Sequence, residues 1–184
     1  MKKAFILLLA STSLLTATPR LRPAEWAQPI IGTELENCYK VSDKVYRSEQ
    51  PGPQSFGELE RFGITGVLNL RRYHNDNDEA EDTTLRLHSI KMSAGWVTEQ
   101  QIVEALRIIN NSKGPVLVHC WHGSDRTGVV VAAYRIVIQG WPKEKAMDEM
   151  RNGGYGYHAS LFSNLMKLLR DLNVEAVKEE IGIQ

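Results

Sequence analysis

The chain has 184 residues, of which 22 are lysine or arginine and 22 are aspartate or glutamate, so its formal net charge is zero. A chain of this length suits a single compact domain. Because the charges balance, there is no broad positive surface to attract nucleic acid or a membrane, and any binding of anions must be local. We expect a monomer that binds no nucleic acid.

The N-terminus has the layout of a secretory signal peptide. Two lysines precede an apolar run from residue 4 to about residue 17, which is too short to span a bilayer comfortably. We expect a signal peptide over residues 1–18, with residues 25–27 as a weaker cleavage site. An uncleaved anchor or a buried N-terminal helix is the alternative interpretation. Export would place the mature protein in the periplasm or outside the cell, and only this segment would contact the membrane.

Residues 19–36 are rich in proline and lack a clear period, so we predict an N-terminal arm or tether there, followed by a domain over residues 37–184. The first half of this domain reads as short elements separated by turns. In chain order these are a strand over 45–51, a helix over 55–63, a strand over 64–70, a polar loop over 71–84 and a strand over 85–92.

The second half alternates helices with one buried strand. Thr98 can cap a helix, with Gln101 as its capping-box partner. Residues 115–120 form the continuous apolar run that is typical of a strand buried on both faces. Helices are then expected over residues 127–140, 143–151 and 159–172. This alternation predicts an α/β fold, with a central, mainly parallel sheet of four or five strands flanked by helices.

The most informative stretch is PVLVHCWHGSDRTG, residues 115–128. Cys120 follows the buried strand, and the next helix is expected to begin near Arg126 or Thr127. The segment between them must curl tightly, which Gly123 permits. The backbone N–H groups of such a loop point inward and form an anion cradle, which the helix N-terminus reinforces. This places the cradle beyond the C-terminal ends of the strands, where ligands bind in open parallel sheets.

Cys120 is a candidate nucleophile in this setting. A helix N-terminus and a nearby guanidinium favour the thiolate over the thiol. Arg126 offers a planar, two-point fork suited to phosphate oxygens, and Thr127 can offer its hydroxyl to the sulfur. Together these residues predict covalent phosphoryl transfer. The only other cysteine, Cys38, could form a reversible disulfide with Cys120 or be a buried, unreactive thiol.

HCWHGSDRTG resembles the H-C-x5-R-[ST] signature of the cysteine-dependent protein tyrosine phosphatases. NCYKVSDKVYRSEQP and GITGVLNLR resemble the opening of the bacterial, exported, dual-specificity-like (TpbA-like) branch of that superfamily. The resemblance implies a phosphocysteine intermediate without metal or cofactor, with Cys120 as nucleophile, Arg126 as phosphate clamp, His119 as a brace of the loop and Thr127 as an aid to the thiolate. The substrate-binding residues would be Trp121, His122, Gly123, Ser124, Asp125 and Arg126.

The sequence departs from that family where an aspartate usually protonates the leaving oxygen. Ser93, Ala94 and Gly95 occupy this place, and no carboxylate lies between Ile90 and Thr98. Asp125 is one candidate donor, because a nearby phosphate would favour its protonated form. His122 and His158 are the alternatives. Without any well-placed donor, aryl phosphates are expected to react faster than alkyl phosphates.

The expected partner is a phosphorylated protein or a small phosphate ester. We predict hydrolysis of phosphotyrosine in proteins, with phosphoserine and phosphothreonine as further substrates. The alternatives are a phosphatase for inositol phosphates or polyphosphate and a phosphate-binding pseudophosphatase, with a sulfurtransferase the least favoured. Several residues are accessory candidates whose ordinary role would be solvation or packing: Arg71, Arg72, Trp96, Trp121 and the loop 152–158, with Arg47 read as structural.

Overall fold

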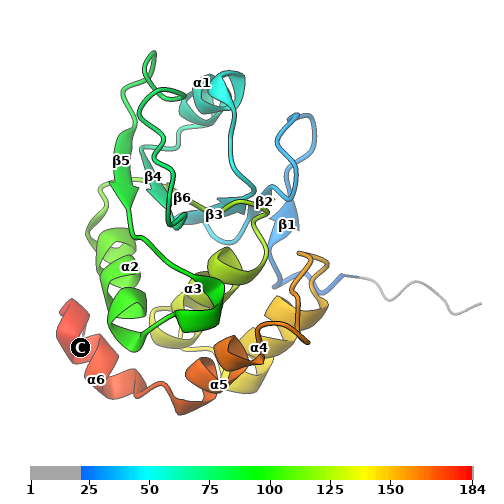
Figure 1. Ribbon diagram of the computed structural model, residues 1–184, viewed down its shortest axis with the longest axis vertical. Coiled ribbons are helices and arrows are strands. Elements are labelled where there is room, and N and C mark those ends of the chain that lie inside the picture. Colours follow the sequence, from blue (N-terminus) through cyan, green and yellow to red (C-terminus); the bar gives the residue numbers. More distant parts are fainter. Residues whose placement is uncertain (1–21, 184) are drawn as a thin grey trace, which may run out of the picture.

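A six-stranded sheet forms the centre of the computed structural model, which describes residues 22–183 (Figure 1). Its strands are β1 (Gln28–Pro29), β2 (Tyr39–Lys40), β3 (Val45–Ser48), β4 (Gly66–Asn69), β5 (Arg86–Ser89) and β6 (Val116–His119). The strand order is β1-β2-β3-β6-β4-β5. The last four strands of this order are parallel, whereas β1, β2 and β3 pair antiparallel. The predicted α/β class and mainly parallel sheet are confirmed, with two short strands added at one edge.

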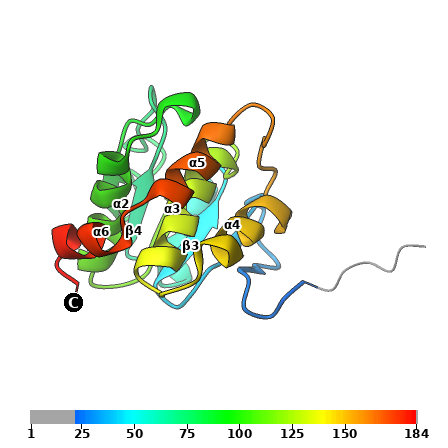
Figure 2. The ribbon, with the colours of Figure 1, turned by 90° about the horizontal axis from the view of Figure 1, so that it is seen from below.

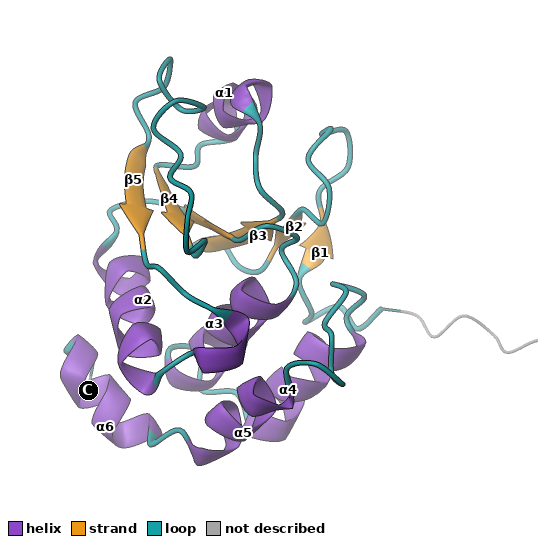
Figure 3. Cartoon of the chain, in the orientation of Figure 1, coloured by secondary structure: helices purple, strands orange, loops and turns teal. Residues whose placement is uncertain are grey.

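The helices lie on both sides of this sheet (Figures 1 and 3). They are α1 (Pro53–Arg61), α2 (Glu99–Asn111), α3 (Asp125–Val137), α4 (Lys143–Asn152), α5 (Ser163–Asp171), α6 (Val174–Ile181) and a 3-10 turn, η1 (Ala94–Trp96). Helix α1 covers one face alone, and the other helices lie together on the opposite side, with α3 in their midst (Figure 2). None of the described helices is both long and apolar enough to cross a membrane.

The alternation of side chains along the strands creates two hydrophobic cores, one on each face of the sheet. Val67 and Leu117 pack with Phe56 of α1, whereas Leu68 and Val118 pack with the larger set of helices. Strand β6 is buried at all four positions, as predicted for the apolar run that ends at Cys120. Nearly all of α3 is buried as well, so the two elements that flank the Cys120–Arg126 loop are fixed in the interior.

Local signals in the sequence explain several element boundaries. Thr98 and Gln101 form the predicted capping box at the start of α2. Helix α1 begins two residues before its predicted start because Pro53 suits the first turn, where a missing N–H costs nothing. Helix α3 ends at Val137, three residues before the predicted end at Gly140. Helix α6 was not predicted, although Asn173 caps it by accepting a hydrogen bond from the N–H of Ala176.

The N-terminal arm is part of the folded domain from residue 22 onward rather than a free tether. Trp26 and Ala27 are buried, and Gln28–Pro29 adds a strand to the sheet. The N–H of Ala27 donates to Oε1 of Glu149 over 2.6 Å. That same buried carboxylate pairs with Arg135 at 2.9 Å and accepts from the hydroxyl of Tyr155 at 3.0 Å. The predicted signal peptide, residues 1–18, lies outside the described residues.

We predict that replacing Glu149 by Ala destabilises the domain strongly. The substitution removes three hydrogen-bonded partners and leaves the guanidinium of Arg135 buried without its counter-ion, which typically costs about 3–5 kcal/mol. Urea unfolding of the two proteins measures the difference. Glu144→Ala is the matched control, because Glu144 lies exposed on the same helix. Similar stabilities for both variants would contradict the role assigned to Glu149.

Candidate active site

Parallel pairing brings three polar strand ends to one edge of the sheet. Ser48 of β3, His119 of β6 and Asn69 of β4 lie opposite one another in the register of the central strands. Cys120 follows directly after β6 and is 2% exposed. Arg126 lies in the first turn of α3. The two residues thus stand on either side of the loop 121–125, as predicted from their spacing.

The loop curls as tightly as the sequence suggested, and Gly123 is the residue that allows it. Its φ is +68°, a conformation that favours glycine. A Cβ at this position would also lie 2.5 Å from the carbonyl oxygen of Ser48, so the loop packs directly on the end of β3. The N–H of Gln50 donates to the carbonyl oxygen of Trp121 over 3.1 Å and fixes the other side of the turn.

Arg47 holds the loop from beneath and is structural, as predicted. Its Nη2 donates to the carbonyl oxygen of Gly123 over 2.6 Å, and its guanidinium lies 3.6 Å from the ring centroid of Tyr155. Burial lowers the pKa of Arg47, whereas the neighbouring Tyr155, Glu149 and Cys120 favour the charged form. A buried positive charge is therefore placed beneath the loop that follows Cys120.

His119 and Asp76 brace the loop from the strand. Nε2 of the fully buried His119 lies 2.9 Å from Oδ2 of Asp76, and Nδ1 lies 3.2 Å from the carbonyl oxygen of Cys120. The other carboxylate oxygen of Asp76 accepts from Asn69 and Gln50, each at 2.9 Å. Burial alone would raise the pKa of Asp76, but the hydrogen bonds and the nearby imidazoles outweigh burial, so that pKa is lowered.

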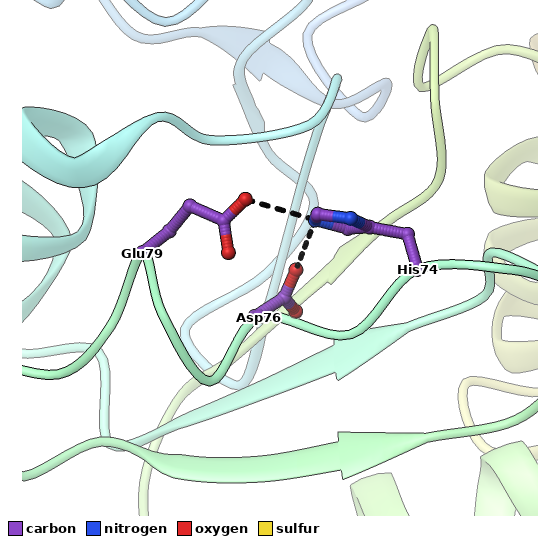
Figure 4. Close-up of side chains that lie close together, drawn as sticks. All are labelled: His74, Asp76 and Glu79. Atoms are coloured by element: carbon purple, nitrogen blue, oxygen red, sulfur yellow. Dashed lines mark ion pairs between the residues drawn. The ribbon is translucent and has the colours of Figure 1, made fainter.

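Sequence reasoning missed Asp76 because it lies within the polar loop 71–84, where an acidic side chain is expected to be solvated. His74, Asp76 and Glu79 also form the one group of potential metal ligands found among residues 22–183 (Figure 4). Nε2 of His74 lies 3.0 Å from Glu79 and 3.8 Å from Asp76. Both oxygens of Asp76 already accept hydrogen bonds, from His119, Asn69 and Gln50. The arrangement of this group is therefore explained by its support of His119.

A cavity of about 580 Å³ opens above the loop. Its lining residues are Arg71, Arg72, Tyr73, Met92, Ser93, Ala94, Trp121, His122, Asp125, Arg126, His158, Leu161 and Phe162. Nη1 of Arg126 lies 3.3 Å from the carbonyl oxygen of Leu70 and 3.4 Å from that of Met92. Arg71 stacks on the ring of Trp121 at 4.0 Å. Burial lowers the pKa of Arg71, and the nearby positive charge of Arg126 lowers it further.

The structure brings Asp125 and His158 together at the wall of this cavity. Oδ1 of Asp125 accepts from the backbone N–H of His158, and Oδ2 lies 2.9 Å from its Nδ1. Among the described residues, Asp125 is the only carboxylate that lines the cavity, and Ser93 and Ala94 line it as well. Trp96, 82% exposed, does not line this cavity, but it lines a neighbouring one with Arg72 and Lys91.

A family model described as the tyrosine phosphatase family matches residues 34–169. The chain belongs to this family. The matched range contains Cys120 and all the residues that line the cavity, Arg126 among them.

Similar proteins include some named dual specificity protein phosphatases and others named inositol diphosphatases. Dual specificity protein phosphatase TpbA of Pseudomonas aeruginosa (strain UCBPP-PA14) is 39% identical over 145 residues, which are 77% of this chain and 63% of that protein. A crystal structure of a Cys→Ser variant of P. aeruginosa TpbA in complex with pTyr matches with a TM-score of 0.77 and 31% identity, covering 88% of this chain and 98% of that chain. Inositol diphosphatase SIW14 of Saccharomyces cerevisiae is 26% identical over 152 residues, which are 77% of this chain and 54% of that protein.

The structure also places Thr127 and Cys38, the remaining two residues for which the sequence suggested a role. The hydroxyl oxygen of Thr127 is buried and has no hydrogen-bond partner among the described residues, which leaves it free to interact with the sulfur of Cys120. Cys38 and Cys120 are both free thiols, and they belong to cores on opposite faces of the sheet. Burial raises the pKa of Cys38 to about 11, so it matches the unreactive thiol rather than the disulfide partner.

The lowered pKa of Asp76 predicts how this brace responds to acid. An aspartate in an unfolded chain has a pKa of about 3.9, so the stability that Asp76 contributes is fully present above that value and is lost as the pH falls through its lower folded pKa. We expect Asp76→Asn to reduce the free energy of unfolding by about 1–3 kcal/mol at about pH 7. The difference from the wild-type protein should narrow below about pH 4. Urea titrations across this range measure it.

Asp78→Asn is the control, because Asp78 is exposed in the same loop and makes no ion pair among the described residues. It should leave the free energy of unfolding nearly unchanged throughout. A wild-type advantage over Asp76→Asn that stays constant from neutral to acidic pH would mean that the carboxylate charge does not stabilise His119.

Proposed function

We propose that this tyrosine phosphatase family member hydrolyses phosphate monoesters through a phosphocysteine intermediate and acts on phosphotyrosine in proteins. The observation that carries the proposal is the loop between Cys120 and Arg126. It is held closed from beneath by Arg47 and opens into a cavity large enough for an aryl phosphate. Phosphate oxygens would be bound by the backbone N–H groups of residues 121–126 and by the guanidinium of Arg126.

The walls of the cavity favour a flat, aromatic ester. Tyr73, Trp121 and Phe162 supply rings around the opening, and Leu161 adds an exposed apolar side chain. A phenyl ring can bury its apolar faces against such walls, whereas a serine or threonine phosphate is too short to reach them. The TpbA variant solved with pTyr supports the same choice of substrate. Phosphoserine and phosphothreonine remain slower substrates in this proposal.

A second candidate is an inositol phosphate or inositol diphosphate. Arg71 and Arg72 line the cavity beside Arg126, and they could bind the additional phosphates of such a ligand. The relatives named inositol diphosphatases support this alternative, at lower identity than TpbA. The loop itself contains no lysine, which argues for the phosphotyrosine substrate. Comparing kcat/KM on a phosphotyrosine peptide and an inositol diphosphate decides between the two.

We also propose that the protein is exported, on the strength of the lysines and apolar run at its N-terminus, and that it is a monomer. An unreactive Cys38 is compatible with an oxidising compartment, where a second reactive thiol could capture Cys120. Cell fractionation of the full chain, compared with a chain in which Lys2 and Lys3 are replaced by Glu, tests the export. Retention of both forms inside the cell would contradict it.

Cys120→Ser and Arg126→Lys should both impair turnover, for different reasons. The serine lacks a thiolate, so hydrolysis of aryl phosphates should fall to the background rate while phosphate binding persists. The lysine keeps the charge but loses the planar two-point contact, which is worth roughly 1.5–3 kcal/mol or about 10- to 100-fold in kcat/KM. Steady-state kinetics with and without EDTA measure both effects.

Wild-type activity should be the same in EDTA, because the proposed chemistry uses no metal. Arg151→Lys provides the matched control for the arginine, since Arg151 is exposed on α4 and does not line the cavity. Turnover by Cys120→Ser, or loss of wild-type activity on chelation, would overturn the cysteine mechanism.

A further inference from the structure

The loop between α4 and α5 is shaped to hold His158 at the cavity wall. Gly154 and Gly156 both have a positive φ, a backbone conformation that favours glycine and shapes this loop. A Cβ on Gly156 would lie 3.1 Å from Oγ of Ser124, so this loop packs directly on the residue before α3. Beyond the turn, the hydroxyl of Tyr157 donates to the carbonyl oxygen of Phe162 over 2.7 Å.

Asp125 fixes both the backbone and the ring of His158. Oδ1 accepts from the backbone N–H and Oδ2 accepts from Nδ1, each over 2.9 Å. The carboxylate is only 11% exposed, whereas the side chain of His158 is 47% exposed. No described residue forms a hydrogen bond with Nε2 of His158, which leaves this nitrogen available to a ligand. Such an oriented carboxylate–imidazole pair is a recurring arrangement for moving a proton at the second ring nitrogen.

Few other groups in the described part of the cavity could supply a proton. The arginines that line it stay charged, and Asp125, the only carboxylate there, uses both oxygens to accept hydrogen bonds from His158. His122 is exposed on the loop and has no carboxylate partner among the described residues. His158 is therefore the one imidazole at this cavity whose orientation is fixed by its surroundings.

We propose that His158 is the catalytic residue that protonates the leaving group, and that Asp125 is the positioning residue that orients it. The inference rests on the proposed phosphatase function. It replaces Asp125 as the direct donor and explains how the site works without a carboxylate at Ser93, Ala94 or Gly95. It also gives a role to the glycine-rich sequence NGGYGYH, residues 152–158.

In both half-reactions the proton is transferred at the same atom, Nε2 of His158. As the sulfur of Cys120 bonds to phosphorus, the P–O bond of the ester breaks, and the bridging oxygen takes the proton from Nε2 of imidazolium His158. A water molecule then attacks phosphorus and gives a proton to neutral Nε2, while the P–S bond breaks and returns the Cys120 thiolate. Asp125 stabilises the imidazolium in each half-reaction and remains unprotonated.

The decisive variant is His158→Asn, because an asparagine side-chain amide can still donate to Asp125 in place of Nδ1 but carries no group at the position of Nε2. We expect its kcat to fall by about 10²–10⁴-fold on phenyl phosphate, whose leaving group needs a proton. On 4-nitrophenyl phosphate, whose leaving group is stable as an anion, the loss should stay within about tenfold. The measured quantity is the ratio of the two rates, which partial misfolding cannot change because it scales both equally.

His88→Asn is the matched control, since His88 lies on β5 away from the cavity, and it should behave as the wild-type protein. Adding Ser93→Asp to His158→Asn should recover the rate on phenyl phosphate, because Ser93 lines the same cavity and the substitution offers a carboxyl there. A rate ratio for His158→Asn equal to that of the wild type, or a shift produced by His122→Asn instead, would overturn the assignment. Inactivity of the wild-type protein on every phosphate ester would instead remove the proposed function.

The role of Asp125 is tested through the same ratio. Asp125→Asn should shift it in the direction of His158→Asn, and the double variant should shift it no further than His158→Asn alone, since one residue acts through the other. Additive shifts would mean that Asp125 donates a proton by itself and would contradict its assignment as a positioning residue.

Discussion

The placement of β6 between β3 and β4 is the constraint on which the site depends. Because the three strands are parallel, their last residues Ser48, His119 and Asn69 lie at one edge of the sheet. His119 contacts the carbonyl oxygen of Cys120, and Asn69 donates to Asp76, the support of His119. An antiparallel neighbour would bring a strand beginning to this edge in place of a strand end. The chain must leave β6 into a confined space whose floor is the backbone of Ser48, and only a residue without a Cβ can occupy position 123 there.

Two buried charges of opposite sign hold this loop, and each is stabilised by a different network. Asp76 lies on the side of β4 and accepts from His119, Asn69 and Gln50. Arg47 lies on the side of β3 and donates to Gly123 while its guanidinium stacks on Tyr155. Buried ions are costly unless they are paired and hydrogen-bonded, so neither network tolerates loss of one member easily. The same requirement links the loop to the N-terminal arm, because Tyr155 donates to Glu149, which also binds Ala27.

Sequence patterns predicted those parts of the fold in which a local signal decides the outcome. The apolar run before Cys120, the capping box at Thr98 and Gln101, and the alternation of strands and helices each have a short-range cause. Strands β1 and β2 have only two residues each, too few for a period, and form because β3 offers an edge. Asp76 and the pairing of Asp125 with His158 could not be predicted, because each joins residues more than 30 positions apart whose neighbours in sequence look solvated. The Cys120–Arg126 loop was predictable because its chemistry lies within seven consecutive residues.

The first turn of α3 divides two tasks between adjacent residues. Successive side chains of an α-helix point about 100° apart. Arg126 consequently extends toward the carbonyl oxygens that follow β4 and β5, at the base of the cavity, whereas Asp125 points toward the loop after α4. Arg126 and the support of His158 thus share one buried helix, and α5 is tied to η1 by the hydrogen bond from Asn164 to the carbonyl oxygen of Ala94. With Cys120 after β6, Arg126 on α3 and His158 before α5, three elements of one packed core position the side chains of the proposed site.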